Sequence, residues 1–344
     1  MDSIDKSIIN GIEYAFLHLD PRLSDNICLL GLGGSHAYGT YNDHSDIDIR
    51  GFATRTPEMI FLGDDYGTIR NTDTDTVIYS ADKAIDLLTK CNPNTLEILG
   101  LRPQDYFVIN DVGQMILDNK SIFLSQQCIR TFIGYSAKQL YRLKQKSTRA
   151  MSEQEFKQHI AETIQGMQPY MESKYGLTGI VIYEDDNELK IDIQEPIIGA
   201  KLETFINFIM EADNVVKDYY KNSSRNSKAI EHDKIDKHAM HLLRAYMMGI
   251  DILEKGEIIT HREAEHDILM AVRNGEMTCP DGFMNEDFYA LVNEYQHRFK
   301  TAAANTRLPL EPDYGAIESL KLKINMDICE KGIDCRRILN ADER

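Results

Sequence analysis

The feature that most constrains the fold is a short apolar run that leads into a glycine-rich segment and then into two closely spaced aspartates. Residues 27–30 are Ile-Cys-Leu-Leu, and Gly31 closes the run. A short apolar run bounded by glycine predicts a buried β-strand. The glycines of residues 31–39 predict a loop, and the alternation over residues 46–52 predicts a second strand.

Asp46 and Asp48 are candidate metal ligands. Two residues apart in a strand, their side chains would project from the same face of a sheet. Carboxylates held this close repel each other unless a cation lies between them, and Mg²⁺ prefers carboxylate and phosphate oxygens. The glycines before Ser35 would let backbone N–H groups approach a phosphate, and the Ser35 hydroxyl would add a donor.

The alternative is that Asp46 and Asp48 are solvent-facing strand residues beside an ordinary glycine turn. An isolated Asp-x-Asp favours that alternative. Here the pair follows a Gly-Gly-Ser sequence, with ten residues between Ser35 and Asp46. This combination favours a site that binds a phosphate and a metal.

The same residues resemble the DNA polymerase β superfamily of nucleotidyltransferases, in which a strand and Gly-Ser are followed about ten residues later by Asp-x-Asp. More narrowly, the chain is similar to the predicted nucleotidyltransferase family that includes RNA-ligase-associated members. The matching residues are Gly34, Ser35 and Gly39, followed by residues 45–51, Ser-Asp-Ile-Asp-Ile-Arg-Gly. Residues 83–99, 134–138 and 237–244 are also similar, so the resemblance runs from about residue 28 to about residue 280.

The resemblance implies a metal-dependent nucleotidyltransferase. Such an enzyme transfers a nucleotide from an NTP or dNTP to a hydroxyl acceptor, releases pyrophosphate and uses two Mg²⁺ or Mn²⁺ ions. The family pattern also implies a third carboxylate from a neighbouring strand, which acts as metal ligand and as base for the acceptor hydroxyl. Asp75 directly precedes a predicted strand at residues 77–79 and is the first candidate, with Asp73 as the alternative.

Three further residues are candidates for nucleotide binding. His36 follows the glycines and either donates to the triphosphate or packs within the loop. Arg50 either contacts a phosphate or pairs with a carboxylate. Lys138 lies on a predicted helix, where it either holds the triphosphate or faces solvent.

His238, His241 and Arg244 are candidates for binding an acceptor phosphate or a nucleotide. They recur at intervals of three along one side of a predicted helix. Two histidines three residues apart also occur in zinc sites, but no third ligand is evident nearby. Nucleotide binding is therefore the favoured interpretation.

Three other classes of protein match the sequence less well. A Rossmann dinucleotide site needs a third glycine at position 36, where this chain has His36, and a helix afterwards. A nucleotide-binding regulatory module that has lost activity would be expected to lack a metal-binding carboxylate, whereas Asp46, Asp48 and Asp75 are all present. A purely structural protein gives no reason for the clustered glycines and acids.

The acceptor is less constrained than the donor. With 38 basic and 55 acidic residues the net charge is −17, which disfavours binding to extended duplex DNA. The resemblance to RNA-ligase-associated proteins favours a nucleic-acid end, a nucleotide or a short template-free oligonucleotide. Nucleotidylation of a protein, as in toxin-like members of the superfamily, is the alternative, and a small-molecule acceptor is a third option.

The expected architecture has two domains. Residues 1–120 form an α/β (α+β) polymerase-β-like catalytic domain with a mixed sheet and helices on one side. Residues 121–344 form a mainly helical domain, interrupted by a β-hairpin at about residues 179–193. Apolar residues spaced over 3–19 predict an N-terminal amphipathic helix, and Ser80 predicts a cap for a helix over 81–91.

The expected location is the cytoplasm. Six cysteines without a Cys-x-x-Cys pair suggest free thiols in a reducing compartment. No apolar run approaches the roughly 20 residues that a membrane helix needs. The N-terminus lacks the basic and apolar regions of a signal peptide. We therefore expect no membrane partner.

Overall fold

The computed structural model describes residues 5–145, 152–194, 199, 201–223, 235–280 and 283–332. By contacts the chain divides into two compact units. The first consists of Met1–Phe123, Ile258–Glu263 and Pro312–Arg344, and the second of Leu124–Glu257 and Ala264–Glu311. The predicted boundary near residue 120 puts residues 258–263 and 312–344 in the later domain. In the described part of the chain, residues 258–263 and 312–332 pack with the N-terminal unit.

The first unit is built on a mixed five-stranded sheet, which confirms the predicted fold class. The strand order is β3-β4-β2-β1-β5, with β2 and β4 parallel and the other neighbours antiparallel. The strands are β1 (Ile27–Leu32), β2 (Ile49–Ala53), β3 (Thr68–Asn71), β4 (Thr76–Ser80) and β5 (Tyr106–Ile109). Strands β3 and β5 were not predicted. The residues of β3, Thr-Ile-Arg-Asn, have a single apolar residue, whereas the apolar run Tyr-Phe-Val-Ile of β5 was an available signal.

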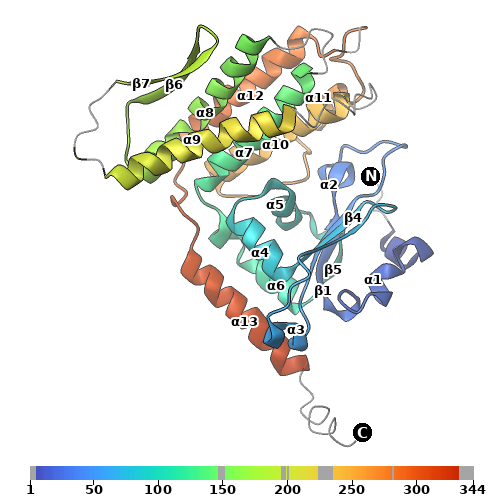
Figure 1. Cartoon of the computed structure of the whole chain (residues 1–344). Helices are drawn as coiled ribbons and strands as arrows, with labels where there is room; N and C mark the ends of the chain where they lie inside the picture. Colours follow the sequence, from blue (N-terminus) through green and yellow to red (C-terminus); the bar gives the residue numbers. More distant parts are fainter. Residues whose placement is uncertain are drawn as a thin grey trace, which may run out of the picture. The chain divides into compact units, whose positions relative to one another are not determined.

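Helices cover both faces of this sheet, whereas helices on one side were predicted. In Figure 1, α4 (Ala81–Thr89), α5 (Pro93–Leu99) and α6 (Asp111–Asp118) lie on one side, and α1 (Phe16–Leu19) lies on the other. Every residue of β1 is buried, as expected for a strand covered on both faces. Helix α4 begins at the predicted cap, where Ser80 Oγ accepts a hydrogen bond from the Lys83 N–H at 3.2 Å.

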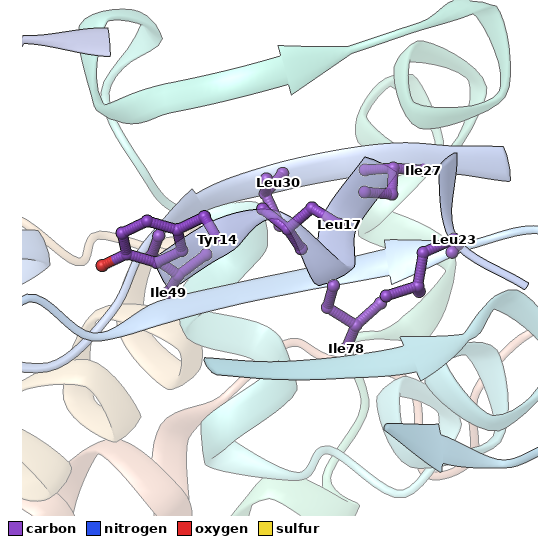
Figure 2. Close-up of a cluster of buried hydrophobic side chains, with 8 residues drawn as sticks. Tyr14, Leu17, Leu23, Ile27, Leu30, Ile49 and Ile78 are labelled. Carbon is purple, nitrogen blue, oxygen red and sulfur yellow. The ribbon is translucent and has the colours of Figure 1, made fainter. Parts of the chain in front are cut away.

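The N-terminal segment packs onto the sheet through a small apolar cluster. Figure 2 shows Tyr14, Leu17 and Leu23 against the sheet residues Leu30 and Ile49, and all five are buried. Side chains from β1, β2 and β4 face this segment. The cluster therefore anchors the N-terminal residues to the strands that lead into the site.

The single amphipathic helix predicted over residues 3–19 is wrong for the part that the structure describes. That part contains two 3₁₀ turns, η1 (Lys6–Asn10) and η2 (Ile12–Tyr14), and then α1. Gly11 separates the turns with an extended backbone, at φ −64° and ψ 157°. Glycine has a low helix propensity, so an interruption of the helix at this residue costs little free energy.

Other helices of the first unit are α2 (Gly34–Tyr38), α3 (Pro57–Leu62) and α13 (Tyr314–Gly332), with 3₁₀ turns η3 (Ser24–Asn26), η4 (Pro103–Asp105) and η5 (Lys120–Phe123). Helix α13 packs against α3, α4 and α6. This packing explains why residues from the end of the chain belong to the first unit.

The second unit is mainly helical, as predicted. Its helices are α7 (Gln127–Gln145), α8 (Glu153–Tyr175), α9 (Leu202–Ser223), α10 (Ile235–Lys255), α11 (His266–Arg273) and α12 (Glu286–Asn305). Strands β6 (Ile180–Asp185) and β7 (Glu188–Ile193) form the predicted hairpin. Asp186 and Asn187 make its turn with φ of 51° and 61°, a conformation that these residues tolerate.

Membrane crossing has no candidate in the described part of the chain. None of its helices is both long enough and apolar enough to span a bilayer.

Candidate functional site

The glycine-rich segment forms a tight connection between β1 and a short helix. Gly33 is extended, and its N–H donates to the Asp48 carbonyl at 2.8 Å. Helix α2 then begins at Gly34, where sequence analysis predicts a loop. Gly39 ends α2 in the left-handed conformation (φ 74°), with its N–H directed to the carbonyls of Ser35 and His36. Ser35 itself is buried within this turn of helix.

Asp48 packs directly against these glycines. Its side chain is buried, and a Cβ at Gly34 would lie only 1.8 Å from Asp48 Oδ2. A Cβ at Gly33 would lie 2.7 Å from Arg50 Cγ. Gly34 also has a positive φ of 55°. A side chain at position 33 or 34 would therefore collide with Arg50 or Asp48. This steric reason for glycine is separate from any need to let a phosphate approach the backbone.

Asp46 has a different environment. Strand β2 begins at Ile49, so the prediction of a strand over residues 46–52 is wrong at its start, and Asp46 is exposed. A compact turn holds the preceding loop, in which the Asn42 N–H donates to Ser45 Oγ at 2.8 Å and Ser45 Oγ donates to Asn42 Oδ1 at 2.9 Å. One carboxylate of the pair is thus buried and the other is open.

Arg50 joins Asp48 to Asp75. The parallel register pairs Ile49 with Thr76, so the residues just before them, Asp48 and Asp75, come together at one edge of β2 and β4. Arg50 Nη2 lies 3.1 Å from Asp48 Oδ1 and 3.7 Å from Asp75 Oδ1. Arg50 Nη1 also donates to the Asp75 carbonyl. Of the two alternatives left open for Arg50, the structure shows the pairing with carboxylates.

Asp75 and Asp73 differ in their relation to this edge. Asp75 is the last residue before β4, in a left-handed conformation with φ 45°, and its side chain is 59% exposed. Asp73 lies within the turn between β3 and β4, where its N–H donates to Asn71 Oδ1 at 2.9 Å. Asp75, unlike Asp73, is therefore linked to Asp48, because both carboxylates pair with Arg50.

Metal binding would draw on this group of carboxylates. Asp46, Asp48 and Asp75 supply the oxygen ligands that Mg²⁺ and Mn²⁺ prefer. Within the described ranges, no three His, Cys, Asp or Glu side chains are already arranged to hold an ion. The guanidinium of Arg50 is the cation that Asp48 and Asp75 share instead. By their chemistry these carboxylates suit a divalent ion, and its binding stays a prediction.

His36 lies beside the same helix. Its ring stacks on Tyr41, with centroids 4.5 Å apart and planes at 17°. This contact corresponds to the loop-packing alternative predicted for His36.

A second group of charged residues supports α2, and sequence analysis did not predict it. Arg102 forms two hydrogen bonds with the buried carboxylate of Asp105, at 2.8 and 3.0 Å. Arg102 Nη1 also lies 3.1 Å from His261 Nε2. The spacing of Arg102 and Asp105 was the available local signal, whereas His261 is 159 residues further along the chain.

His261 contacts the end of α2. A Cβ at Gly39 would lie 2.3 Å from His261 Cε1, and the Arg262 N–H donates to the Tyr38 carbonyl at 3.1 Å. Burial and the neighbouring Arg102 hold the pKa of His261 below its usual value. Since the guanidinium of Arg102 can only donate, it favours the neutral ring with Nε2 as acceptor. His261 therefore helps to fix α2 in its position beside Asp48.

The remaining predicted residues lie in the second unit. Lys138 is a half-buried residue of α7, and His238, His241 and Arg244 lie on α10. Arg244 Nη2 lies 2.9 Å from His241 Nδ1. Nucleotide binding by these residues stays a prediction.

Comparison with protein families gives one match. Residues 12–167 match the family model described as the RNA repair pathway DNA polymerase beta family. The matched region includes the glycine segment, Asp46, Asp48, Asp75 and Lys138, and it ends before α10. No curated protein and no solved structure gave a significant match. Residues 12–167, less than half of the chain, are thus similar to a polymerase β superfamily nucleotidyltransferase of the RNA repair pathway.

Proposed function

We propose that the protein transfers a nucleotide from an NTP or dNTP to a hydroxyl of a nucleic-acid end or a short oligonucleotide, with release of pyrophosphate. The observation that carries the proposal is the arrangement around α2. Asp48 is buried against Gly34, while Asp46 is exposed two residues earlier. A buried carboxylate with fixed orientation beside an open one is suited to hold metal ions between the protein and a triphosphate.

Each carboxylate has a separate role in this proposal. Asp48, fixed by Gly34 and Arg50, would orient the metal site, and Asp46 would complete it from the solvent side. Asp75 would accept the proton of the acceptor hydroxyl. A bound pair of Mg²⁺ or Mn²⁺ ions would supply charge neutralisation at the attacking and the leaving oxygen.

Donor binding would use the segment that links β1 to α2. The short connection at Gly33 and Gly34 allows a phosphate to come close to the backbone. Ser35 and His36 on α2 would contact the triphosphate, and Arg50 would move from its carboxylates to a phosphate. Lys138, His238, His241 and Arg244 of the second unit remain candidates for nucleotide binding.

The acceptor class follows from the family and from the charge. The family description names RNA repair, which favours an RNA end or a nucleotide. A net charge of −17 opposes extended duplex DNA, so a short strand suits the chain better. Among the described residues, Cys28, Cys91, Cys128, Cys279 and Cys329 form no disulfide, in keeping with a reducing cytoplasm as the place of the reaction. Nucleotidylation of a protein, or nucleotide binding without catalysis, is the alternative.

The test is incorporation of an α-labelled nucleotide. The full chain is incubated with Mg²⁺ or Mn²⁺ and each labelled NTP or dNTP, alone, with short RNA and with cell lysate. Asp46→Asn and Asp48→Asn should abolish the transfer. Asp43→Asn removes an exposed carboxylate from the same loop and should leave it unchanged.

Three outcomes separate the alternatives. Label in an oligonucleotide or at an RNA end supports the proposal. Label in a protein band from the lysate supports protein nucleotidylation and contradicts a nucleic-acid acceptor. Absence of incorporation and of pyrophosphate release under every condition supports the inactive binding module and contradicts the proposed reaction.

A further inference from the structure

Five basic residues gather on α10 and α11 of the second unit. The α10–α11 basic cluster consists of Lys237, His238, His241 and Arg244 on α10, and Arg273 at the end of α11. On α10 these residues are spaced by one, three and three, which places them on one side of the helix. Helix α11 packs against α10 within the unit.

The contacts within the cluster fix the hydrogen-bonding role of His241. Arg244 is 5% exposed, and its Nη2 lies 2.9 Å from His241 Nδ1. A guanidinium can only donate, so Nδ1 of His241 accepts this bond. In the neutral ring the proton is then on Nε2, which becomes a hydrogen-bond donor. The cluster therefore contains the guanidinium donors of Arg244 and Arg273, the ammonium of Lys237 and the Nε2–H of His241.

The electrostatic surroundings of His241 are strongly positive. Its pKa is held well below the usual value by burial first, and then by Arg244, Lys237, His238 and Arg273. Burial and the neighbouring Arg244 lower the pKa of Arg273 as well. The nearby carboxylate of Asp236 accepts a hydrogen bond from Thr278 Oγ1 at 2.6 Å. Positive charge is thus concentrated in a chain whose net charge is −17.

We propose that the α10–α11 basic cluster binds the phosphate groups of a nucleotide. Guanidinium groups match the oxygens of a phosphate with parallel N–H bonds, and Lys237 and His241 Nε2–H add further donors. A bound phosphate would also relieve the repulsion between the basic residues. The same repulsion opposes a zinc ion at His238 and His241. The inference deepens the proposed function and rests on it, because the phosphate would belong to the donor or the acceptor of that reaction.

The first experiment measures binding of tripolyphosphate to the full chain by calorimetry, without metal ions. Arg273→Gln and Lys237→Gln should each weaken binding at least about tenfold, since each removes a charged donor. Arg298→Gln is the matched control, because Arg298 lies on α12 of the same unit and pairs with Glu254 at 2.9 Å. Its affinity should equal that of the wild type.

Unchanged binding of tripolyphosphate in the cluster variants would overturn the inference. If Arg273→Gln and Lys237→Gln bind tripolyphosphate as the wild type does, the cluster is not a phosphate site. The same holds if Arg298→Gln weakens binding to the same extent, because the effect would then reflect net charge alone. Circular dichroism of each variant verifies that the fold is retained.

A second set of ligands identifies the source of the phosphate. An NTP is compared with a short RNA that carries a 5′-phosphate and with the same RNA carrying a 5′-hydroxyl. If the donor occupies the cluster, Arg273→Gln should weaken binding of the NTP. If the acceptor occupies it, Arg273→Gln should weaken binding of the 5′-phosphorylated RNA but not of the RNA with a 5′-hydroxyl. Equal affinity of wild type and variant for all three ligands contradicts the inference.

The inference and the proposed reaction can fail separately. Binding is measured without turnover, and it can be repeated in the Asp46→Asn variant. Binding that depends on Arg273 in a protein without transferase activity would keep the phosphate site and remove the reaction. Transfer that persists unchanged in Arg273→Gln and Lys237→Gln, with unchanged phosphate binding, would keep the reaction and remove the site.

Discussion

The carboxylate of Asp48 occupies the space that a side chain at position 34 would need. Asp48 Oδ2 lies 1.8 Å from the position of a Cβ on Gly34. This contact links the glycine segment to the Asp-x-Asp segment through side-chain packing as well as through chemistry.

Replacement of Gly34 by alanine should displace Asp48. The new methyl group cannot coexist with the carboxylate, and a shift of about 1 Å in a catalytic group lowers the rate about 100-fold. Gly63→Ala is the control, because Gly63 also has a positive φ, 74°, but has no atom within 4 Å of the added Cβ. It should lose about 1–2 kcal/mol of stability through backbone strain and keep full activity. The kcat of both variants and their unfolding midpoints provide the measurement.

The third carboxylate can be identified by a pair of variants. Asp75→Asn should lower kcat about 100-fold or more if Asp75 is the general base. Asp73→Asn removes a carboxylate from the same turn and should leave kcat unchanged, since Asp75 is the residue paired with Arg50. Steady-state kinetics of the two variants decide the assignment. A loss in Asp73→Asn with normal Asp75→Asn would reverse it.

Removal of Arg50 should make the protein more dependent on a divalent ion. Arg50→Ala leaves Asp48, a buried carboxylate, without its 3.1 Å partner, at a cost of about 1–3 kcal/mol. Mg²⁺ should then raise the unfolding temperature of Arg50→Ala more than that of the wild type. Arg55→Ala is the control, because it breaks a comparable 2.7 Å pair with Asp82 elsewhere in the same unit. An equal response to Mg²⁺ in all three proteins would contradict metal binding at Asp48.

His261 should make the stability of the protein depend on pH. Its pKa is lowered in the folded chain by burial and by Arg102, so the fold favours the neutral ring. In the unfolded chain His261 takes up a proton near the ordinary histidine pKa of about 6.5. In the folded chain its pKa is lower, so it does so only at lower pH. The free energy of unfolding should therefore be highest above this pH and should fall as the pH decreases through it.

The variant His261→Asn should reduce this dependence. The decrease will not vanish, because the pKa of His241 is lowered in the same direction. Denaturant unfolding between pH 5 and pH 8, on the scale of ordinary histidine titration, provides the measurement. An identical profile for His261→Asn and the wild type would show that His261 does not titrate as inferred.

Several elements could be predicted from sequence because their signals are local. The apolar run at Ile27–Leu32 forms a buried strand, Ser80 caps α4, and Asp186 and Asn187 form the hairpin turn. In each case neighbouring residues determine the backbone conformation, so no distant contact is needed. The resemblance to a polymerase β family could be seen for a related reason. The Gly-Ser and Asp-x-Asp residues lie within one short segment, and this segment falls inside residues 12–167, which match the family model.

Sequence alone determined the types of residues available near α2 and their order along the chain. Tertiary structure decided which of them are buried and which meet. Asp46 and Asp48 are two residues apart, yet only Asp48 is buried, because β2 begins at Ile49 and α2 covers one of the two. Asp75 reaches Arg50 through the parallel pairing of β2 with β4, and His261 reaches Arg102 across 159 residues. Such contacts depend on the packing of distant segments, which the periodicity of a single segment does not encode.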